Sequence, residues 1–379
     1  MKIQTTLFKP ETGTMDAVLA ASNGAPQLIV CFGAPAVGLT PDVFSAIRCA
    51  YPHATLLGCS TAGEIFGSEI GDGGMVLAAL QFDHSSVRAV AARIESPADS
   101  QGAGAYIAKS LQGPDLRAIL VLSDGLGVNG SALVRGFNEI LDDSVVVTGG
   151  LAGDGDRFQK TWVLHDGAPA SGYVTAAGLY GKRLHIGCGS NGGWDIFGAE
   201  RRVTRAKDNI LYELDGKPAL QIYKEYLGPR AADLPASALL FPLALRASRD
   251  APKSLVRTIL AISEADQSMT FAGDVPEGYL AQLMRANFDH LVDAASKAGK
   301  DAGANTSAAG GMLSLAISCV GRRLVLGEHA EDETEAVLES LPAGTQQIGF
   351  YSYGEISPYI SGTCDLHNQT MTVTTISEV

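Results

Sequence analysis

Four short segments of this sequence place a glycine and a carboxylate directly after an apolar, strand-like run. The carboxylates are Glu64, Asp154, Asp274 and Glu355. Glycine lets the backbone approach a ligand closely and present its N–H groups, and a carboxylate adds charge and orientation. Alternatively, each carboxylate only caps a helix or ties down a turn. The recurrence favours a shared cavity for a small ligand where some of these turns meet.

Two further segments concentrate polar side chains where strands are expected to end. SDGLGVNGS begins at Ser123, and GFYSYGEISPY brings three tyrosines, among them Tyr359, beside Glu355. Arg322 could hold a ligand carboxylate by paired hydrogen bonds, or neutralise a nearby acid. Rigid turns with satisfied hydrogen bonds are the alternative for all of them. The candidate ligand-binding residues are Cys59, Ser60, Thr61, Gly63, Glu64, Ser123, Asp124, Asn129, Gly153, Asp154, Arg322, Tyr351, Tyr353 and Glu355.

Catalytic chemistry has one candidate, the Cys59-Ser60 pair on its glycine-flanked turn. A nucleophile needs a base within reach, and no GxSxG elbow surrounds any serine. A cysteine in such an apolar run is typical of a small buried residue. We therefore expect a binding protein and not an enzyme, with a Cys59 or Ser60 hydrolase as the less favoured reading.

Nucleotide and metal motifs are weak. A GxGxxG pattern spans Gly187 to Gly192, but the following WDIFG is a poor helix start, and no GxxxxGK[ST] occurs. The seven histidines never pair at HxH, HxxxH or HExxH spacing. This predicts no structural metal site, although a single histidine could still hold a haem iron.

Composition restricts the class of protein. With 46% hydrophobic residues, the 379-residue chain can build a compact core. Its 41 acidic against 28 basic residues give a net charge of −13, which argues against nucleic acid or an anionic membrane as partner. The six cysteines form no CxxC pair, and neither a signal peptide nor a run of about 18 apolar residues is visible. We expect a cytoplasmic protein.

The elements that must position these residues recur along the chain. A strand at Leu28–Phe32, a helix at Pro41–Tyr51, a second strand, a glycine turn and two more strands follow one another, and the order returns 90 residues later at Ala118–Ser123. GCSTAGEI and GFYSYGEI repeat the turn at an offset of 291. Such units are too long for a solenoid. They predict an α/β (α+β) layered sandwich with mixed sheets, internally duplicated, in two related domains, 1–194 and 195–379.

Two connecting segments complete the prediction. Asp208–Gly228 is expected to form two helices divided at Asp215-Gly216. The Gly/Ala/Ser-rich stretch Lys297–Met312 is expected to be a mobile surface loop. The strand order stays open between one large mixed sheet and two stacked sheets.

Seven strings in order now resemble one family: GCSTAGEI, LVLSDGLGVNGS, TGGLAGDG, GGWDIFGAERRVTRAKDNILYELDGKPAL, SCVGRRLVLG, GFYSYGEISP and CDLHNQTMT. They resemble the FIST family (F-box and intracellular signal transduction proteins), with N-terminal and C-terminal modules in their usual order, as in stand-alone bacterial members. The resemblance implies a sensory protein that binds small ligands such as amino acids.

The same resemblance implies how a signal would leave the protein. Bacterial members act with histidine kinases, cyclic-dinucleotide enzymes or chemotaxis-type proteins, and no such segment is fused here, so a separate partner is expected. Some stand-alone members are similar to nitric-oxide-sensing haem proteins, which makes a haem-based sensor the alternative reading. The cofactor stays unknown, with haem left open, since the resemblance does not assign a haem ligand to any one of the histidines.

Overall fold

The computed structural model describes residues 1–11, 13, 15, 19, 24–234, 236–251, 254–304, 311–358 and 363–379. Tyr359 and the centre of the expected loop Lys297–Met312 lie outside these residues. The first part of that loop is helical, because α6 (Phe288–Gly303) continues through it and buries Ala298 and Ala302.

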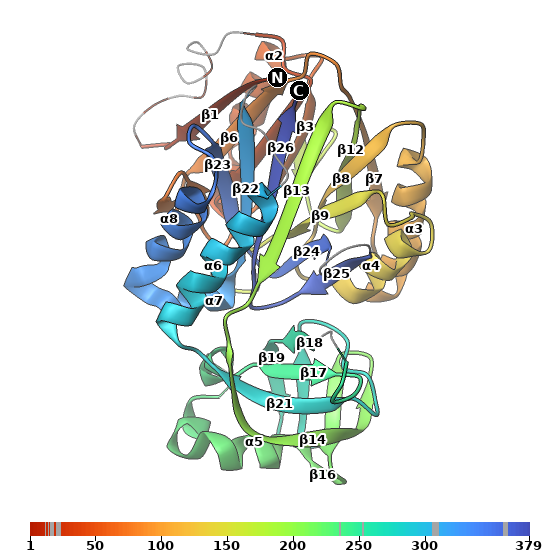
Figure 1. Ribbon diagram of the computed structural model, residues 1–379, viewed down its shortest axis with the longest axis vertical. Coiled ribbons are helices and arrows are strands. Elements are labelled where there is room, and N and C mark those ends of the chain that lie inside the picture. The colour runs from red at the N-terminus through yellow and green to blue at the C-terminus, as the bar shows by residue number, and fades with distance from the viewer. Residues whose placement is uncertain are drawn as a thin grey trace.

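Three six-stranded mixed sheets with one common topology form the main body (Figure 1). The first sheet runs in the order β1 (Lys2–Phe8), β6 (Met75–Gln81), β2 (Leu28–Gly33), β3 (Thr55–Ser60), β10 (Val163–His165), β11 (Ala168–Ala170). The second runs β7 (Ser86–Arg93), β12 (Tyr173–Tyr180), β8 (Leu116–Ser123), β9 (Val146–Leu151), β24 (Gly354–Pro358), β25 (Cys364–His367). The third runs β13 (Leu184–Asn191), β26 (Met371–Glu378), β22 (Met312–Cys319), β23 (Gln346–Ser352), β4 (Glu64–Phe66), β5 (Glu69–Gly71).

Each sheet is built around one repeat of the chain. A parallel pair, β2–β3, β8–β9 or β22–β23, is joined through helices, and an antiparallel return strand, β6, β12 or β26, lies beside it. The joining helices are α2 (Pro41–Ala50), α4 (Gly130–Asn138), α7 (Val320–Leu326) and α8 (Ala330–Ser340). The predicted mixed α/β fold with internal duplication is confirmed, and the repeat occurs three times.

The three units exchange hairpins in a closed ring. The first unit's β4–β5 pairs with β23 of the third, the third unit's β24–β25 pairs with β9 of the second, and the second unit's β10–β11 pairs with β3 of the first. A common core fills the space between the sheets, and the rings of Phe32 and Phe350 lie 4.6 Å apart there. The strand ends of all three units therefore meet.

Helices cover the outer faces of the sheets. α2 buries Val43, Phe44 and Ile47 against the first sheet, with Pro41 in its first turn as predicted. α3 (Ser100–Leu111) packs on α4, and α6 packs on α8. In Figure 1, α6, α7 and α8 lie on one side of the body and α3 and α4 on the other. Among the described residues, no helix is long and apolar enough to cross a bilayer.

A small β domain lies between β13 and α6 and projects from one end of the body (Figure 1). Its strands follow the order β18 (Ser254–Arg257), β17 (Leu243–Arg246), β21 (Leu280–Arg285), β14 (Asp195–Lys207), β15 (Ile210–Leu214), β20 (Ser268–Phe271), β19 (Ile259–Ser263), with β16 (Lys217–Pro218) beside β15. The expected boundary near Trp194 falls where β13 gives way to β14. From α6 onward, the described residues return to the body, and the division into 1–194 and 195–379 stays a prediction.

The helix expected over Asp208–Gly228 is wrong in its first half. β15 and β16 form a hairpin there, and only α5 (Ala219–Leu227) is helical. Asp208 and Asp215 adopt left-handed φ angles of 51° and 52°, followed at Gly216 by 74°. Aspartate and glycine tolerate this region and so turn the chain back, which the prediction took for a break between helices.

Candidate functional site: a pocket between two strand-end turns

The turns after β3, β9 and β23 hold one another in place. Three backbone hydrogen bonds close a ring between the units: Ala62 N to Tyr351 O at 2.8 Å, Gly153 N to Ser60 O at 3.0 Å, and Tyr353 N to Leu151 O at 3.1 Å. A side chain at Gly153 would meet Ala62 N at 2.8 Å, so only glycine fits where the first two turns touch. The glycine-rich turns predicted from the sequence thus meet at the centre of the body.

Strand pairing shows that the sequence distance between equivalent residues of the first two units grows from 90 to 91 between the two strands of the parallel pair. Leu28 pairs with Thr55, whereas Ala118 pairs with Val146, so the second crossover is one residue longer. Asp154 consequently stands where the first unit has Gly63. It does not repeat the contacts of Glu64.

A cavity of about 640 Å³ opens between the first and second turns. We call it the strand-end pocket, and its polar and aromatic lining consists of Thr61, Glu64, Asp72, Asp154, Arg157, Gln159, Lys160, Trp162 and Ser171. Gly63 lines it as well. Four of the predicted residues, Thr61, Gly63, Glu64 and Asp154, are therefore brought together. The volume is within the usual range for a small-molecule site.

Glu64 is the buried acid of the pocket, with 1% of its surface exposed. Its carboxylate accepts hydrogen bonds from the Thr61 hydroxyl and, at 3.2 Å, from Gly74 N. Burial raises its pKa to about 7, in spite of these two bonds. Near neutral pH, Glu64 therefore exists in both protonation states.

Asp72 lies at the rim of the pocket. Arg323 grips its carboxylate with two hydrogen bonds of 2.8 and 2.6 Å and also donates to Ala62 O at 2.6 Å. The hydrogen bond from Arg323 holds the pKa of Asp72 below its usual value. This pair ties α7 of the third unit to the turn of the first.

Asp154 fastens the segment 154–160, which forms the opposite wall. Its Oδ2 accepts from the backbone N–H groups of Gln159 and Lys160, both at 2.9 Å, and the Tyr353 hydroxyl donates to Oδ1. Burial by itself raises the pKa of Asp154, but the Tyr353 and backbone donors outweigh it and hold the pKa below its usual value. The carboxylate thereby fixes the backbone of the segment that carries Arg157 and Lys160.

The structure places Glu355, Arg322 and Tyr351 outside this pocket. Glu355 is fully buried and accepts from the Ser352 hydroxyl at 2.7 Å and from the hydroxyl of Thr370 at 2.9 Å. Burial raises its pKa to about 8. It lies within β24, has no exposed surface and does not line the strand-end pocket.

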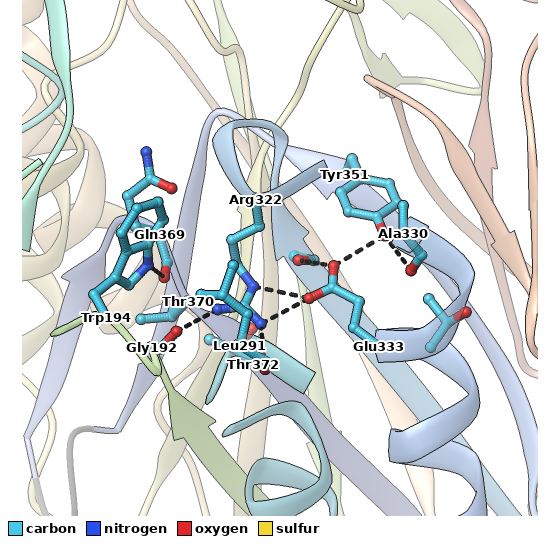
Figure 2. A network of polar contacts seen from close by, with 12 residues as sticks. Gly192, Trp194, Leu291, Arg322, Ala330, Glu333, Tyr351, Gln369, Thr370 and Thr372 are labelled. Atoms are coloured by element: carbon cyan, nitrogen blue, oxygen red, sulfur yellow. Dashed lines mark hydrogen bonds and ion pairs between the residues drawn. The ribbon is translucent and has the colours of Figure 1, made fainter. Parts of the chain in front are cut away.

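Arg322 and Tyr351 belong to a buried network in the third unit (Figure 2). Arg322 Nη2 lies 2.7 Å from Glu333 Oε2, and the Tyr351 hydroxyl donates to Glu333 Oε1 at 2.9 Å. Arg322 also donates to the carbonyls of Gly192 and Leu291. These carbonyls flank the small β domain in the chain, so Arg322 fixes where that domain leaves and re-enters the body.

The segment from Ser123 to Asn129 also has a structural role. Asp124 accepts from Thr161 Oγ1 at 3.0 Å and from Gly172 N at 2.7 Å, and Ser123 donates to Asp124 O. Asn129 caps α4 by accepting from Ala132 N at 2.9 Å. Its side-chain amide donates to Asp274 at 3.0 Å, and Arg135 pairs with the same acid. The glycine-acid turn at Asp274 thus joins the small β domain to α4 and does not reach the pocket.

The Cys59-Ser60 pair is inaccessible. Cys59 is fully buried, and burial raises the pKa of its thiol, so a thiolate is disfavoured. Ser60 Oγ accepts from Trp162 N at 3.0 Å. This geometry gives a nucleophilic role no support.

Six of the seven histidines lack the setting of a haem ligand. His367 is buried with Nε2 3.0 Å from Ser357 O, and the His165 ring stacks on Tyr173 at 4.2 Å. Axial ligation requires a ring nitrogen directed into an apolar slot. Neither ring has that arrangement, and His53, His84, His290 and His329 are exposed.

The sequence prediction missed the walls of the pocket. Trp162, Arg157, Lys160 and Asp72 follow the turns by several residues and belong to no motif. The only signal was the polar run Asp154 to Lys160 directly after the second glycine turn.

Comparisons with known proteins agree with the sequence strings. The family model of the FIST N domain matches residues 27–217, and that of the FIST C domain matches residues 219–358. An uncharacterized protein of Methanocaldococcus jannaschii is 26% identical over 201 residues, which cover 49% of this chain and 38% of that protein. The chain thus matches about two fifths of that relative's length.

Among solved structures, a cyanuric acid hydrolase of A. caulinodans aligns over 99% of both chains, with 10% identity and a TM-score of 0.39. The two family models together span residues 27 to 358 in the order expected from the sequence strings. The chain therefore belongs to the FIST family of sensory signal-transduction proteins.

Proposed function

We propose that the strand-end pocket is the sensory site, and that it binds a small polar metabolite such as an amino acid. The observation that carries this proposal is the mixed charge of one cavity where two units meet. Glu64 and Asp72 come from the first unit, and Arg157 and Lys160 come from the second. A zwitterion presents an ammonium group to the first wall and a carboxylate to the second.

The state of the polar groups supports this assignment. Each oxygen of Glu64 has one donor, so each retains capacity to accept another hydrogen bond. Trp162, with its ring held by a bond to Pro35 O at 3.3 Å, adds a rigid apolar face. A site that combines one apolar face with a few fixed polar groups is typical of small-molecule recognition. Because Cys59 and Ser60 are engaged in the core, we propose binding without catalysis.

Titration calorimetry with the common amino acids and dicarboxylic acids tests the proposal. Glu64→Gln and Arg157→Ala should each weaken binding about tenfold or more, since each removes one charge partner. Glu355→Gln is the matched control: it replaces a buried acid with a similar bond set outside the pocket, and binding should persist. If no compound binds, or if the pocket variants bind as well as wild type, the pocket is not the sensory site.

We further propose that the signal passes to a separate partner, a histidine kinase or a cyclic-dinucleotide enzyme, in the cytoplasm. Family membership supports a signalling output, and no disulfide joins the six cysteines, all of which lie among the described residues, which suits a reducing compartment. Reconstitution with the candidate partner should show kinase or cyclase activity that changes when the pocket ligand is added. Activity that ignores both the protein and its ligand would contradict that pairing.

A further inference from the structure

An apolar groove runs between the body and the small β domain, next to the strand-end pocket. It has a volume of about 880 Å³. Its apolar lining includes Leu126, Phe158, Leu234, Leu240, Leu260 and Leu324. These residues come from five separate parts of the chain, so the groove exists only in the assembled fold.

The groove exposes large apolar side chains to solvent. Leu126, Phe158, Leu260 and Leu324 are 39 to 45% exposed, and all four line this groove. Soluble proteins seldom leave such side chains gathered in one place unless another molecule covers them. Burying a Leu or Phe fully contributes about 1.5 to 3 kcal/mol, so four partly exposed ones provide a substantial gain for an occupant.

Charge indicates which occupant fits. Among the lining residues that the structure describes, Asp156 and Asp233 are the charged ones, and both are exposed. The whole chain carries a net charge of −13. A second copy of this chain would therefore bring like charge to the groove. An amphipathic helix with an apolar stripe and basic flanks complements both features.

One segment serves both the groove and the pocket. Within residues 154–160, Gly155, Arg157 and Gln159 line the strand-end pocket, whereas Asp156 and Phe158 line the groove. Phe158 adopts a left-handed φ of 51°, which is strained for an aromatic residue. Its ring stacks on Tyr353 at 4.4 Å, and the Tyr353 hydroxyl bonds Asp154 of the pocket. Segment 154–160 and Tyr353 therefore connect the pocket wall to the groove by two direct contacts.

We propose that this groove is the docking surface for a signalling partner, which inserts an amphipathic helix with lysine or arginine flanks. The surface itself does not depend on the pocket. Only its regulation by a metabolite rests on the function proposed above, and segment 154–160 carries that coupling.

The test uses the full chain and synthetic peptides of about 18 residues, long enough to form a helix of several turns. One peptide carries leucines at i, i+3, i+4 and i+7 with lysine flanks. A second replaces the lysines with glutamates, and a third has the lysines but shuffled leucines. Fluorescence anisotropy should show binding of the first peptide, with the other two weaker by about tenfold.

Two variants with equal exposure locate the binding. Leu324→Glu lies in the groove at 45% exposure and Phe288→Glu lies outside it at 46%. Leu324→Glu should lower the affinity for the first peptide about tenfold, as expected for a central apolar contact. Phe288→Glu should leave that affinity unchanged. Because both side chains are exposed, both variants should keep the wild-type melting temperature.

Several results would overturn the proposal. The first is an equal loss of affinity for the first peptide in both variants. The second is binding of the shuffled peptide as tight as that of the first peptide. The third is a groove that binds a small apolar dye but neither of these peptides. A dimer in solution that Leu324→Glu dissociates would assign the groove to a second copy instead. Peptide binding in a protein that binds no metabolite would support the groove and contradict the sensory pocket, so the two proposals fail separately.

Discussion

Glu64 and Glu355 make corresponding hydrogen bonds in the first and third units, yet only Glu64 lines a cavity. Each carboxylate accepts from a hydroxyl three residues earlier and from the N–H of the residue before the return strand. The hydroxyls belong to Thr61 and Ser352, and the N–H groups belong to Gly74 and Thr370. Of these two buried acids, Glu64 lines the strand-end pocket and Glu355 does not. Comparing them separates ligand chemistry from folding.

Glu355 should make the protein less stable as pH rises. Its folded pKa of about 8 exceeds the ordinary value of 4.5 because burial disfavours the charged form. Between these values the folded state holds a proton that the unfolded state has released, so the free energy of unfolding falls with increasing pH. Glu355→Gln removes this pH-dependent contribution to the free energy of unfolding. Between pH 5 and pH 8, denaturant unfolding should show the free energy of unfolding of the variant rising relative to that of wild type by on the order of 3 kcal/mol. A constant difference over that range would contradict the raised pKa of Glu355.

Binding of an amino acid should strengthen as pH rises through 7. An ammonium group favours ionised Glu64, whose pKa of about 7 leaves it partly protonated at neutral pH. Binding therefore releases a proton, and the affinity should increase about tenfold for each pH unit well below that pKa and level off above it. The N-acetylated form of the same ligand lacks the ammonium group and is the control. Calorimetry in buffers of different ionisation enthalpy would detect the proton; equal pH profiles for both ligands would exclude Glu64 as the ammonium partner.

Arg322→Met should destabilise the protein by about 3 to 5 kcal/mol, because Glu333 would remain buried without its partner. The double variant Arg322→Met with Glu333→Leu should recover much of that loss, since no unpaired charge remains. Thermal and denaturant unfolding measure both. If the double variant is as unstable as the single one, the bonds from Arg322 to the Gly192 and Leu291 carbonyls matter more than the ion pair.

Tyr353→Phe should weaken metabolite binding as well as stability. Its hydroxyl holds Asp154 and also donates to Gly155 O at 3.0 Å, so its loss loosens segment 154–160. Tyr180→Phe is the matched control, because that buried hydroxyl bonds Leu111 O away from the pocket. Each variant should lose about 1 kcal/mol of stability. Only Tyr353→Phe should change the affinity for metabolite and for the helical peptide; equal effects on binding would mean that segment 154–160 does not couple the two sites.

Local patterns were sufficient for much of the fold. The apolar run of β2 and the helical spacing of Val43, Phe44 and Ile47 identified the first strand and helix, since burial of one face repeats within a few residues. The recurring glycine turns likewise revealed the repeat and located Thr61, Gly63, Glu64 and Asp154. The family strings could be identified for the same reason, because each occupies one continuous stretch of the chain.

The closed exchange of hairpins could not be read from the sequence, because pairing β4 with β23 joins residues nearly 300 positions apart and local periodicity does not specify a partner. That exchange decides which turns meet, and so it gives Glu64 a cavity and buries Glu355. One additional residue between β8 and β9 puts Asp154 in the place of Gly63, a shift that only the strand register reveals. Trp162 and Lys160 became pocket walls through the same long-range contacts. The sequence by itself determined the repeating units and their turns, and the tertiary structure decided which turns enclose a site, since that depends on packing between units.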